Sequence, residues 1–204
     1  MSQPARPNRP TRAELLAAAG KTVPDVIAPE LKVLICGINP GLYTAVIGHH
    51  FGRPGNRFWP ALYAAGITPR LLSPYEEREL LNYGFGITNL VARATAAADE
   101  LTANELVEGG KILVAKIRRY RPRILAVLGI TAYRTAFAQP KAVIGAQDSW
   151  IGTEEGYPGA RLWVLPNPSG LNAHYTLPEL ARLYREVKEW ADQEDPADQE
   201  DPAD

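Results

Sequence analysis

The sequence predicts an α/β protein of three layers, in which helices cover both faces of a central, mainly parallel sheet of four strands. One observation points to this class. Short apolar runs that are typical of buried strands alternate along the chain with segments of helical character. This alternation implies parallel strands joined by right-handed crossovers. The 204 residues, 46% of them hydrophobic, suffice for one domain with a sizeable core.

Each expected strand is a short run rich in Val, Ile and Leu. We expect strands at 31–36, 85–91 and 123–129, and a fourth within 161–170 that ends in a turn. Expected helices cover 12–20, 56–66, 74–84, a long segment that ends near residue 120, 130–138 and 179–191. Three of them follow a Thr-x-x-Glu capping box, which begins at Thr11, Thr102 and Thr176.

The charged residues divide the chain into three parts. Seven of the 23 acidic residues lie in 192–204, which leaves 16 acidic against 22 basic residues and a charge of +6 in the rest. We expect a disordered basic arm at 1–10, a single domain at 11–191 and a disordered acidic tail at 192–204. A mildly basic body is compatible with a polyanionic partner, although many soluble domains reach this charge without one.

Other bulk features exclude several classes of protein. The single cysteine, Cys36, excludes a disulfide within the chain and any four-cysteine metal cluster. It closes an apolar strand, so we expect a buried, inert thiol. No segment resembles a membrane span, and the first residues lack an apolar signal region, so we expect a cytoplasmic protein.

The loops that leave the carboxyl ends of the strands are the expected ligand site, because ligands of parallel sheets bind there. The first loop reads "GINPG" and continues as "GHHFGRPGNRF". Its glycines allow a close approach of backbone to a ligand, yet no Gly-Lys-Ser/Thr phosphate loop follows. Phe51 lies among these glycines and could stack on a flat ring. Alternatively, Phe51 is a core aromatic and Asn39 only forms the turn.

The loop after the fourth strand contains "NPSGLN", residues 167–172. Leu171 is an apolar residue at the tip of this turn. Exposure of its side chain to water lowers solubility, which suggests a functional role. Apolar side chains that wedge into a base stack are a known device for distorting DNA. The alternative is that Leu171 packs back onto the last helix.

Histidines of the first loop offer no metal site. His49 and His50 are expected to be solvated loop residues, and together with His174 they lack metal-ligand spacing. We expect neither a metal nor a cofactor.

The motifs "GINPG", "NRFW" and "NPSGL", in this order and spacing, resemble the mismatch-specific uracil-DNA glycosylase family, which is related to the thymine-DNA glycosylases. The stretch "EGGKILVAKIRRYRPRILAVLG" is also similar to that family. The resemblance runs from about residue 24 to residue 187. It implies a small four-stranded α/β fold and excision of uracil, or a related damaged pyrimidine, opposite guanine in double-stranded DNA. It further implies a monomer of the bacterial cytoplasm or nucleoid that hydrolyses the bond without a lyase step.

The resemblance also implies roles for individual residues. Asn39 would hold a water against C1′ of the sugar of an extruded base. Phe51 would stack on that base, and backbone near Ile38 and Phe51 would read its edge. The remaining residues carried over are Gly41 and Asn167 at the base, and Ser169, Gly170, Leu171 and Asn172 at the DNA. Among the last four, Leu171 would fill the gap in the duplex, Ser169 would contact a phosphate, and backbone at Gly170 and Asn172 would face the widowed guanine.

One position departs from the family. Its members carry an acidic residue where "TNLVARAT" has Ala92. We take Ala92 as the position of an absent catalytic acid and expect a slow enzyme. Two other interpretations stay open: a non-catalytic binder of DNA lesions or mismatches, and a nucleotide-binding enzyme that uses the glycine loop for phosphates.

Overall fold

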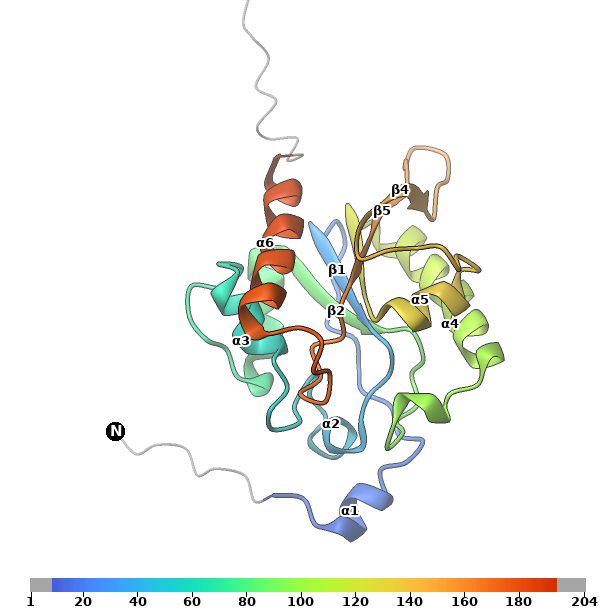
Figure 1. The fold of residues 1–204 in the computed structure, drawn as a ribbon. Helices are drawn as coiled ribbons and strands as arrows, with labels where there is room; N and C mark the ends of the chain where they lie inside the picture. The colour runs from blue at the N-terminus through green and yellow to red at the C-terminus, as the bar shows by residue number, and fades with distance from the viewer. Residues whose placement is uncertain (1–8, 194–204) are drawn as a thin grey trace, which may run out of the picture.

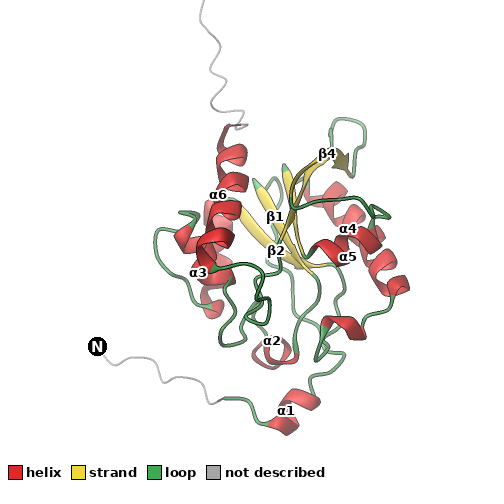
Figure 2. Ribbon diagram, in the orientation of Figure 1, coloured by secondary structure: helices red, strands yellow, loops and turns green. Residues whose placement is uncertain are grey.

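The computed structural model of the chain describes residues 9–193 and shows a sheet covered by helices on both faces (Figures 1 and 2). Most of the expected basic arm, residues 1–8, and of the acidic tail, residues 194–204, lies outside the described residues. The final helix continues through Gln193, two residues beyond the expected end of the domain at 191.

The sheet has five strands in the order β2-β1-β3-β5-β4. They are β1 (Val33–Gly37), β2 (Phe85–Asn89), β3 (Ile124–Leu128), β4 (Gly145–Ile151) and β5 (Ala160–Leu165). The first three and β5 pair in parallel, as predicted, whereas β4 pairs antiparallel with β5 at the edge. The α/β class is therefore confirmed, and the expected count of four strands is wrong by this edge strand.

Two layers of helices enclose the sheet. The long helices are α4 (Ala103–Tyr120) and α6 (Leu177–Gln193), and the shorter ones are α1 (Arg12–Leu16), α2 (Leu42–Ile47), α3 (Phe58–Ala64) and α5 (Ile130–Ala136). The described residues also include two 3₁₀ helices, η1 (Pro74–Tyr83) and η2 (Ala98–Glu100). Helices α3 and α6 cover one face, and α4 and α5 cover the other (Figure 2). Each layer has its own apolar cluster against the sheet.

Local signals in the sequence account for several helix starts. The side chain of Thr11 accepts from the backbone of Glu14, and that of Thr102 from the backbone of Glu105, as capping boxes predict. Helix α1 ends at Leu16, earlier than expected. Cys36 is fully buried in β1, and burial raises the pKa of its thiol, which fits an inert side chain.

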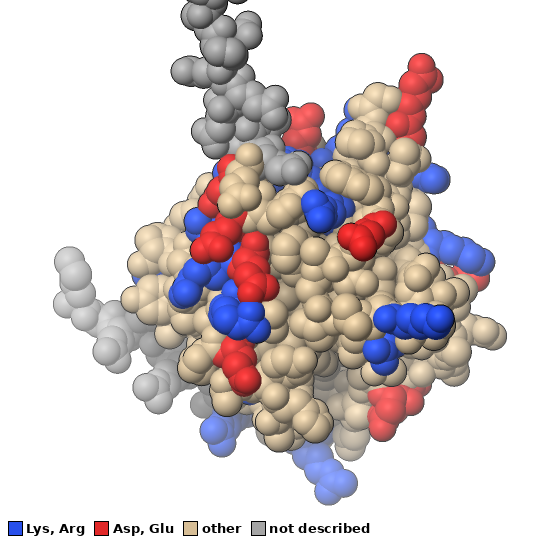
Figure 3. All heavy atoms as spheres, turned by 45° about the horizontal axis from the view of Figure 1, so that its top comes forward, with Lys and Arg blue, Asp and Glu red and all other residues tan. Residues whose placement is uncertain are grey.

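Charges are interspersed on the face that Figure 3 brings forward. Along α6, Arg182 pairs with Glu186, and Lys188 pairs with Asp192 at 2.7 Å. Alternating signs of this kind solvate a helix without making a single-sign patch. Within residues 9–193, no helix is long and apolar enough to cross a membrane.

A close approach between α4 and the end of β2 fixes the segment that follows β2. A Cβ at Gly109 would lie 2.3 Å from the carbonyl oxygen of Leu90, which is backbone and cannot swing away. Only glycine allows this distance. The contact sets where the segment after residue 90 begins, and this segment forms one wall of the candidate site.

We expect Gly109→Ala to lower the free energy of unfolding by about 1–3 kcal/mol, the usual cost of overpacking, despite the better helix propensity of alanine. Urea titration followed by circular dichroism measures the effect. Gly41→Ala is the matched control for stability, because a Cβ there meets no atom within 4 Å and φ is −75°. Equal stability of the two variants would mean that α4 and Leu90 simply move apart.

Candidate active site

Four segments from the carboxyl edge of the sheet enclose a cavity of about 230 Å³. They follow β1, β2 and β5, and the fourth is the glycine-rich stretch before α3. The cavity brings together seven of the predicted site residues: Ile38, Asn39, Gly41, Phe51, Asn167, Ser169 and Leu171. Gly170 lines an adjoining depression, while Ala92 and Asn172 line neither. The rule that ligands bind beyond the strand ends thus located the cavity from sequence.

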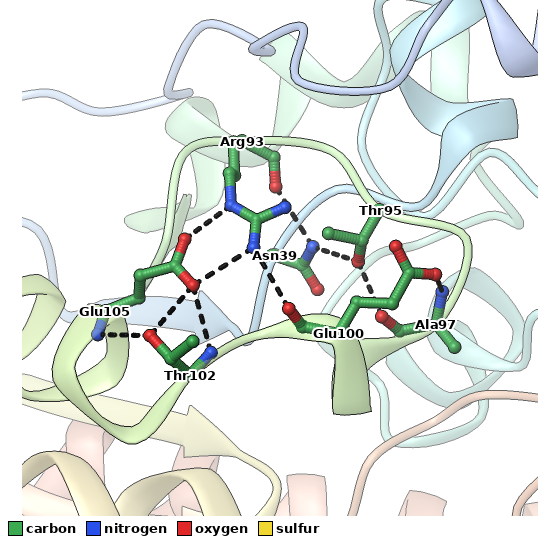
Figure 4. Close-up of polar contacts among 7 residues, drawn as sticks. All are labelled: Asn39, Arg93, Thr95, Ala97, Glu100, Thr102 and Glu105. Atoms are coloured by element: carbon green, nitrogen blue, oxygen red, sulfur yellow. Dashed lines mark hydrogen bonds and ion pairs between the residues drawn. The ribbon is translucent and has the colours of Figure 1, made fainter.

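The amide of Asn39 is held in one orientation by the segment after β2 (Figure 4). Its Nδ2 donates to the carbonyl oxygen of Arg93 at 3.0 Å and to Oγ1 of Thr95 at 2.7 Å. The Arg93 carbonyl can only accept, so the nitrogen and oxygen of the amide are assigned by this partner. Both N–H groups are used, and the amide oxygen Oδ1 remains to accept a hydrogen bond from a ligand or a water.

A second set of contacts fixes the carbonyl that holds Asn39. The Arg93 guanidinium pairs with both carboxylate oxygens of Glu105, and its Nη2 also donates to the carbonyl oxygen of Glu100 at 3.1 Å (Figure 4). Glu105 closes the capping box of α4 with Thr102. The Arg93 guanidinium and, next, the Thr102 N–H lower the pKa of Glu105 to about 2. The start of α4 therefore supports Asn39 through Arg93.

Phe51 is fixed from behind by the apolar core. Its ring stacks on Phe58 with 3.8 Å between centroids and 19° between planes, and Phe58 is fully buried. Phe51 also lines the cavity and has a positive φ of 53°. Such a backbone is uncommon outside glycine, and it is often found at functional sites. The two interpretations of Phe51, a core aromatic and a cavity residue, are compatible, because Phe51 packs against the core and also lines the cavity.

His50 is buried, so the expectation of a solvated loop histidine is wrong for this residue. Its Nε2 lies 2.9 Å from the carbonyl oxygen of Pro24 and its backbone N–H donates to Glu77 at 2.7 Å. A carbonyl only accepts, so Nε2 carries a proton and Nδ1 faces the amide nitrogen of Asn89 at 3.5 Å. His49 is partly buried and pairs with Glu77.

Asn89 is a candidate site residue that sequence reasoning missed. It is the last residue of β2, lines the cavity and lies next to Gly37, the last residue of β1. A Cβ at Gly37 would come within 2.6 Å of Oδ1 of Asn89 and 3.4 Å of Cζ of Phe51. Glycine at 37 therefore leaves room for a polar amide and an aromatic ring side by side. The signal was available, since Asn89 is a polar residue at a strand end.

The loop 167–172 keeps Leu171 in solvent. Leu171 is 78% exposed, so the alternative that it packs onto the last helix is wrong. The turn beneath it is closed by its own polar groups: Oδ1 of Asn167 accepts from the backbone of Ser169, and the backbone of Asn172 donates to the carbonyl of Ser169 at 2.9 Å. An exposed leucine on a closed turn beside a cavity matches the geometry of a wedge.

The cavity lining is nearly free of ionisable groups. Among the described residues, its lining includes Arg53 and His50 but no Asp, Glu, Lys or Cys. Within the same residues, no cluster of three or more His, Cys, Asp or Glu could hold a metal ion. The chemistry available here is hydrogen bonding by amides and backbone, stacking on an aromatic ring, and placement of water.

The cavity is thus lined by an aromatic ring, four asparagines and an exposed leucine. Residues 24–190 match the Uracil DNA glycosylase superfamily, and the chain belongs to that superfamily. Membership supports the activity of a DNA glycosylase, a hydrolase that acts on uracil in DNA and serves DNA repair.

The fold is similar to the solution NMR structure of a protein from Methanosarcina acetivorans that has been assigned provisionally as a uracil DNA glycosylase. The two share 16% sequence identity with a TM-score of 0.52, and the match covers 83% of this chain and 98% of that chain. At this identity the likeness concerns the fold.

Proposed function

We propose that this protein is a monofunctional glycosylase that flips uracil, mispaired with guanine, out of double-stranded DNA and hydrolyses its N-glycosidic bond. The observation that carries the proposal is the amide of Asn39, a residue that lines the cavity together with Phe51 and whose two N–H groups are both engaged. The motifs that resemble mismatch-specific glycosylases support the choice of a G·U pair. The protein would act as a monomer.

In this proposal the residues divide the work. Phe51 stacks on the extruded base, while the side chain of Asn89 and backbone near Ile38 read its edge. Gly41 and Asn167 border the base, Ser169 contacts a phosphate, and backbone at Gly170 and Asn172 faces the widowed guanine. Leu171 fills the gap in the duplex, which offsets part of the few kcal/mol that unstacking costs.

A neutral amide suffices because the bond breaks largely by dissociation. Uracil departs as an anion that backbone N–H groups stabilise, which is electrostatic preorganisation. The water then attacks the cationic sugar, and its proton passes to solvent or to the departed uracil anion, so the water needs placement more than a general base. Oδ1 of Asn39 accepts a hydrogen bond from that water. No lysine lines the cavity in the described part of the chain, which supports hydrolysis without an amine-dependent lyase step.

Single-turnover excision tests the proposal. Labelled duplexes with one G·U, A·U or G·T pair, and single-stranded DNA with one uracil, are incubated with excess protein and then cleaved with alkali. We expect the fastest cleavage on the G·U duplex. Failure to cleave uracil in any of these contexts, together with selective binding of the G·U duplex, would instead favour a non-catalytic mismatch binder.

That second candidate has one observation behind it, the absence of a carboxylate from the lining among the described residues. Ala92 is exposed and lies one residue before Arg93, the residue whose carbonyl holds Asn39. We retain position 92 as that of a family acid whose loss weakens catalysis. Among the described residues, no lysine lines the cavity to hold phosphates, which argues against a nucleotide-binding enzyme.

Ala92→Asp should raise the single-turnover rate on a G·U duplex by tenfold or more, about 1.4 kcal/mol of barrier. Ala92 itself does not line the cavity, so the aspartate would act from just beyond the lining, where a carboxylate can stabilise a cationic sugar or orient the water. DNA affinity should be equal or weaker, because a new negative charge repels phosphate. Ala19→Asp, at another exposed alanine, is the control for added charge. Rates within twofold of the parent would remove position 92 from the catalytic scheme.

A further inference from the structure

Contacts from outside its own turn keep Leu171 exposed to solvent. We call residues Ser169–Asn172 the wedge loop. An apolar side chain that is 78% exposed gains by folding back onto the protein unless the backbone beneath it is fixed. The contacts of the wedge loop with the rest of the chain therefore decide whether Leu171 is ready to enter a base stack.

One side chain supplies most of these contacts. The Nη2 atom of Arg57 donates to the carbonyl oxygen of Ser169 and to that of Asn172, each at 2.7 Å. Its Nη1 donates to the carbonyl oxygen of Tyr175, just beyond the loop. The backbone N–H of Arg57 donates to the carbonyl of Pro168 at 3.0 Å, just before the loop. One residue thus holds four carbonyl oxygens across 168–175.

Arg57 itself stands on a rigid base. It immediately precedes α3, whose first residue, Phe58, is fully buried and stacks on Phe51. The wedge loop also touches the same segment directly, because a Cβ at Gly170 would lie 2.6 Å from the carbonyl oxygen of Gly55. Residues 55–58 therefore connect the wall of the base cavity with the wedge loop.

The guanidinium group suits this task better than any other side chain. Its planar fork presents several donors in fixed directions, whereas a lysine ammonium is a point charge on a flexible stem. A guanidinium that is committed to three carbonyls within the protein is not free to bind phosphate. Its Nε is buried without a hydrogen-bond partner among the described residues, which further argues against a role at the DNA surface.

We propose that Arg57 is a positioning residue, which holds the wedge loop in the conformation that inserts Leu171 and fixes it relative to Phe51. This inference rests on the proposed function for its consequence in catalysis. The structural part, that Arg57 orders the wedge loop, is tested without any DNA.

Limited chymotrypsin digestion tests the ordering, because Leu171 and Tyr175 are cleavage sites for this protease within or beside the loop. We expect Arg57→Gln and Arg57→Lys to be cut there at least fivefold faster than the parent, with circular dichroism unchanged. Arg134→Gln is the matched control, since Nε and Nη2 of Arg134 clamp the carbonyl oxygen of Ala142 on the other face of the sheet. Equal cleavage in Arg57→Gln and Arg134→Gln would overturn the proposal, as would new cleavage spread over the whole chain.

A double-mutant cycle on a G·U duplex tests the catalytic consequence. Arg57→Gln should slow single-turnover excision about tenfold, and Arg57→Lys should slow it nearly as much because charge alone does not replace the fork. In a Leu171→Ala background, Arg57→Gln should cost less than twofold, since the loop then has no wedge to position.

The positioning role would be overturned if the losses in excision rate of Arg57→Gln and Leu171→Ala multiplied in the double variant. An excision rate of Arg57→Lys equal to that of the parent would also overturn it. A parent protein that excises no uracil would defeat the proposed function, while the digestion would still report whether Arg57 orders the loop. The two failures are therefore distinguishable.

Discussion

Asn39→Ala is expected to slow uracil excision by about 10²- to 10³-fold, the usual cost of removing one preorganised polar group from an active site. Alanine deletes Oδ1, the atom proposed to accept a hydrogen bond from the attacking water. Affinity for the G·U duplex should stay within about twofold, because Asn39 is proposed to bind water and not DNA. Single-turnover rates and fluorescence anisotropy with the same duplex measure the two quantities.

Asn104→Ala is the control for this experiment, because Asn104 is an exposed asparagine in the first turn of α4. It should excise uracil at the parent rate. Asn39→Ala also leaves the Arg93 carbonyl and the Thr95 hydroxyl without their donor. The melting temperature of the variant should therefore be measured alongside its excision rate. If Asn39→Ala cuts at the parent rate, the water is placed by another group.

Gly37→Ala is expected to reduce excision by about 10- to 100-fold, with little loss of stability. The new Cβ would lie 2.6 Å from Oδ1 of Asn89, the end of a side chain that can rotate away. The fold should therefore tolerate the methyl group, but the amide of Asn89, which is proposed to read the base, is displaced. Loss of one well-placed polar contact pair is worth about 1–3 kcal/mol, which corresponds to this range of rates.

The double variant Gly37→Ala/Asn89→Ala separates this mechanism from a blocked cavity. Asn89→Ala alone should lose as much activity as Gly37→Ala, and the two losses should not multiply, because both remove the same amide from the base. Multiplying losses would show that the methyl group excludes the base directly or disturbs Phe51, whose Cζ would lie 3.4 Å from it.

The sequence was informative wherever the structure depends on local patterns. Strands β1, β2, β3 and β5 are apolar runs, and the carboxyl-edge rule predicts that the loops of Asn39, Phe51 and Leu171 meet, as they do around the cavity. The roles assigned to these residues remain proposals. What the sequence located was the cavity and the side chains that surround it.

The missed elements have physical causes. Strand β4 is an edge strand with mostly exposed or half-buried residues and an irregular register between Ala146 and Trp150, so it shows no buried apolar run. Helix α2 has only six residues and no side-chain cap, so it resembled a loop. The burial of His50 depends on Pro24, 26 residues earlier, and local periodicity does not report such a contact.

Glu105 is half-buried on α4 and binds Arg93, whose carbonyl oxygen accepts from the amide of Asn39, the group proposed to place the water. A scan of all single substitutions that ranks positions by burial, or by distance from DNA, would class it as tolerant. We expect substitutions of Glu105 to reduce activity as much as substitutions of a buried residue do. The lowered pKa of Glu105 means that this link is complete above about pH 4.5 and is lost as the pH falls toward 2.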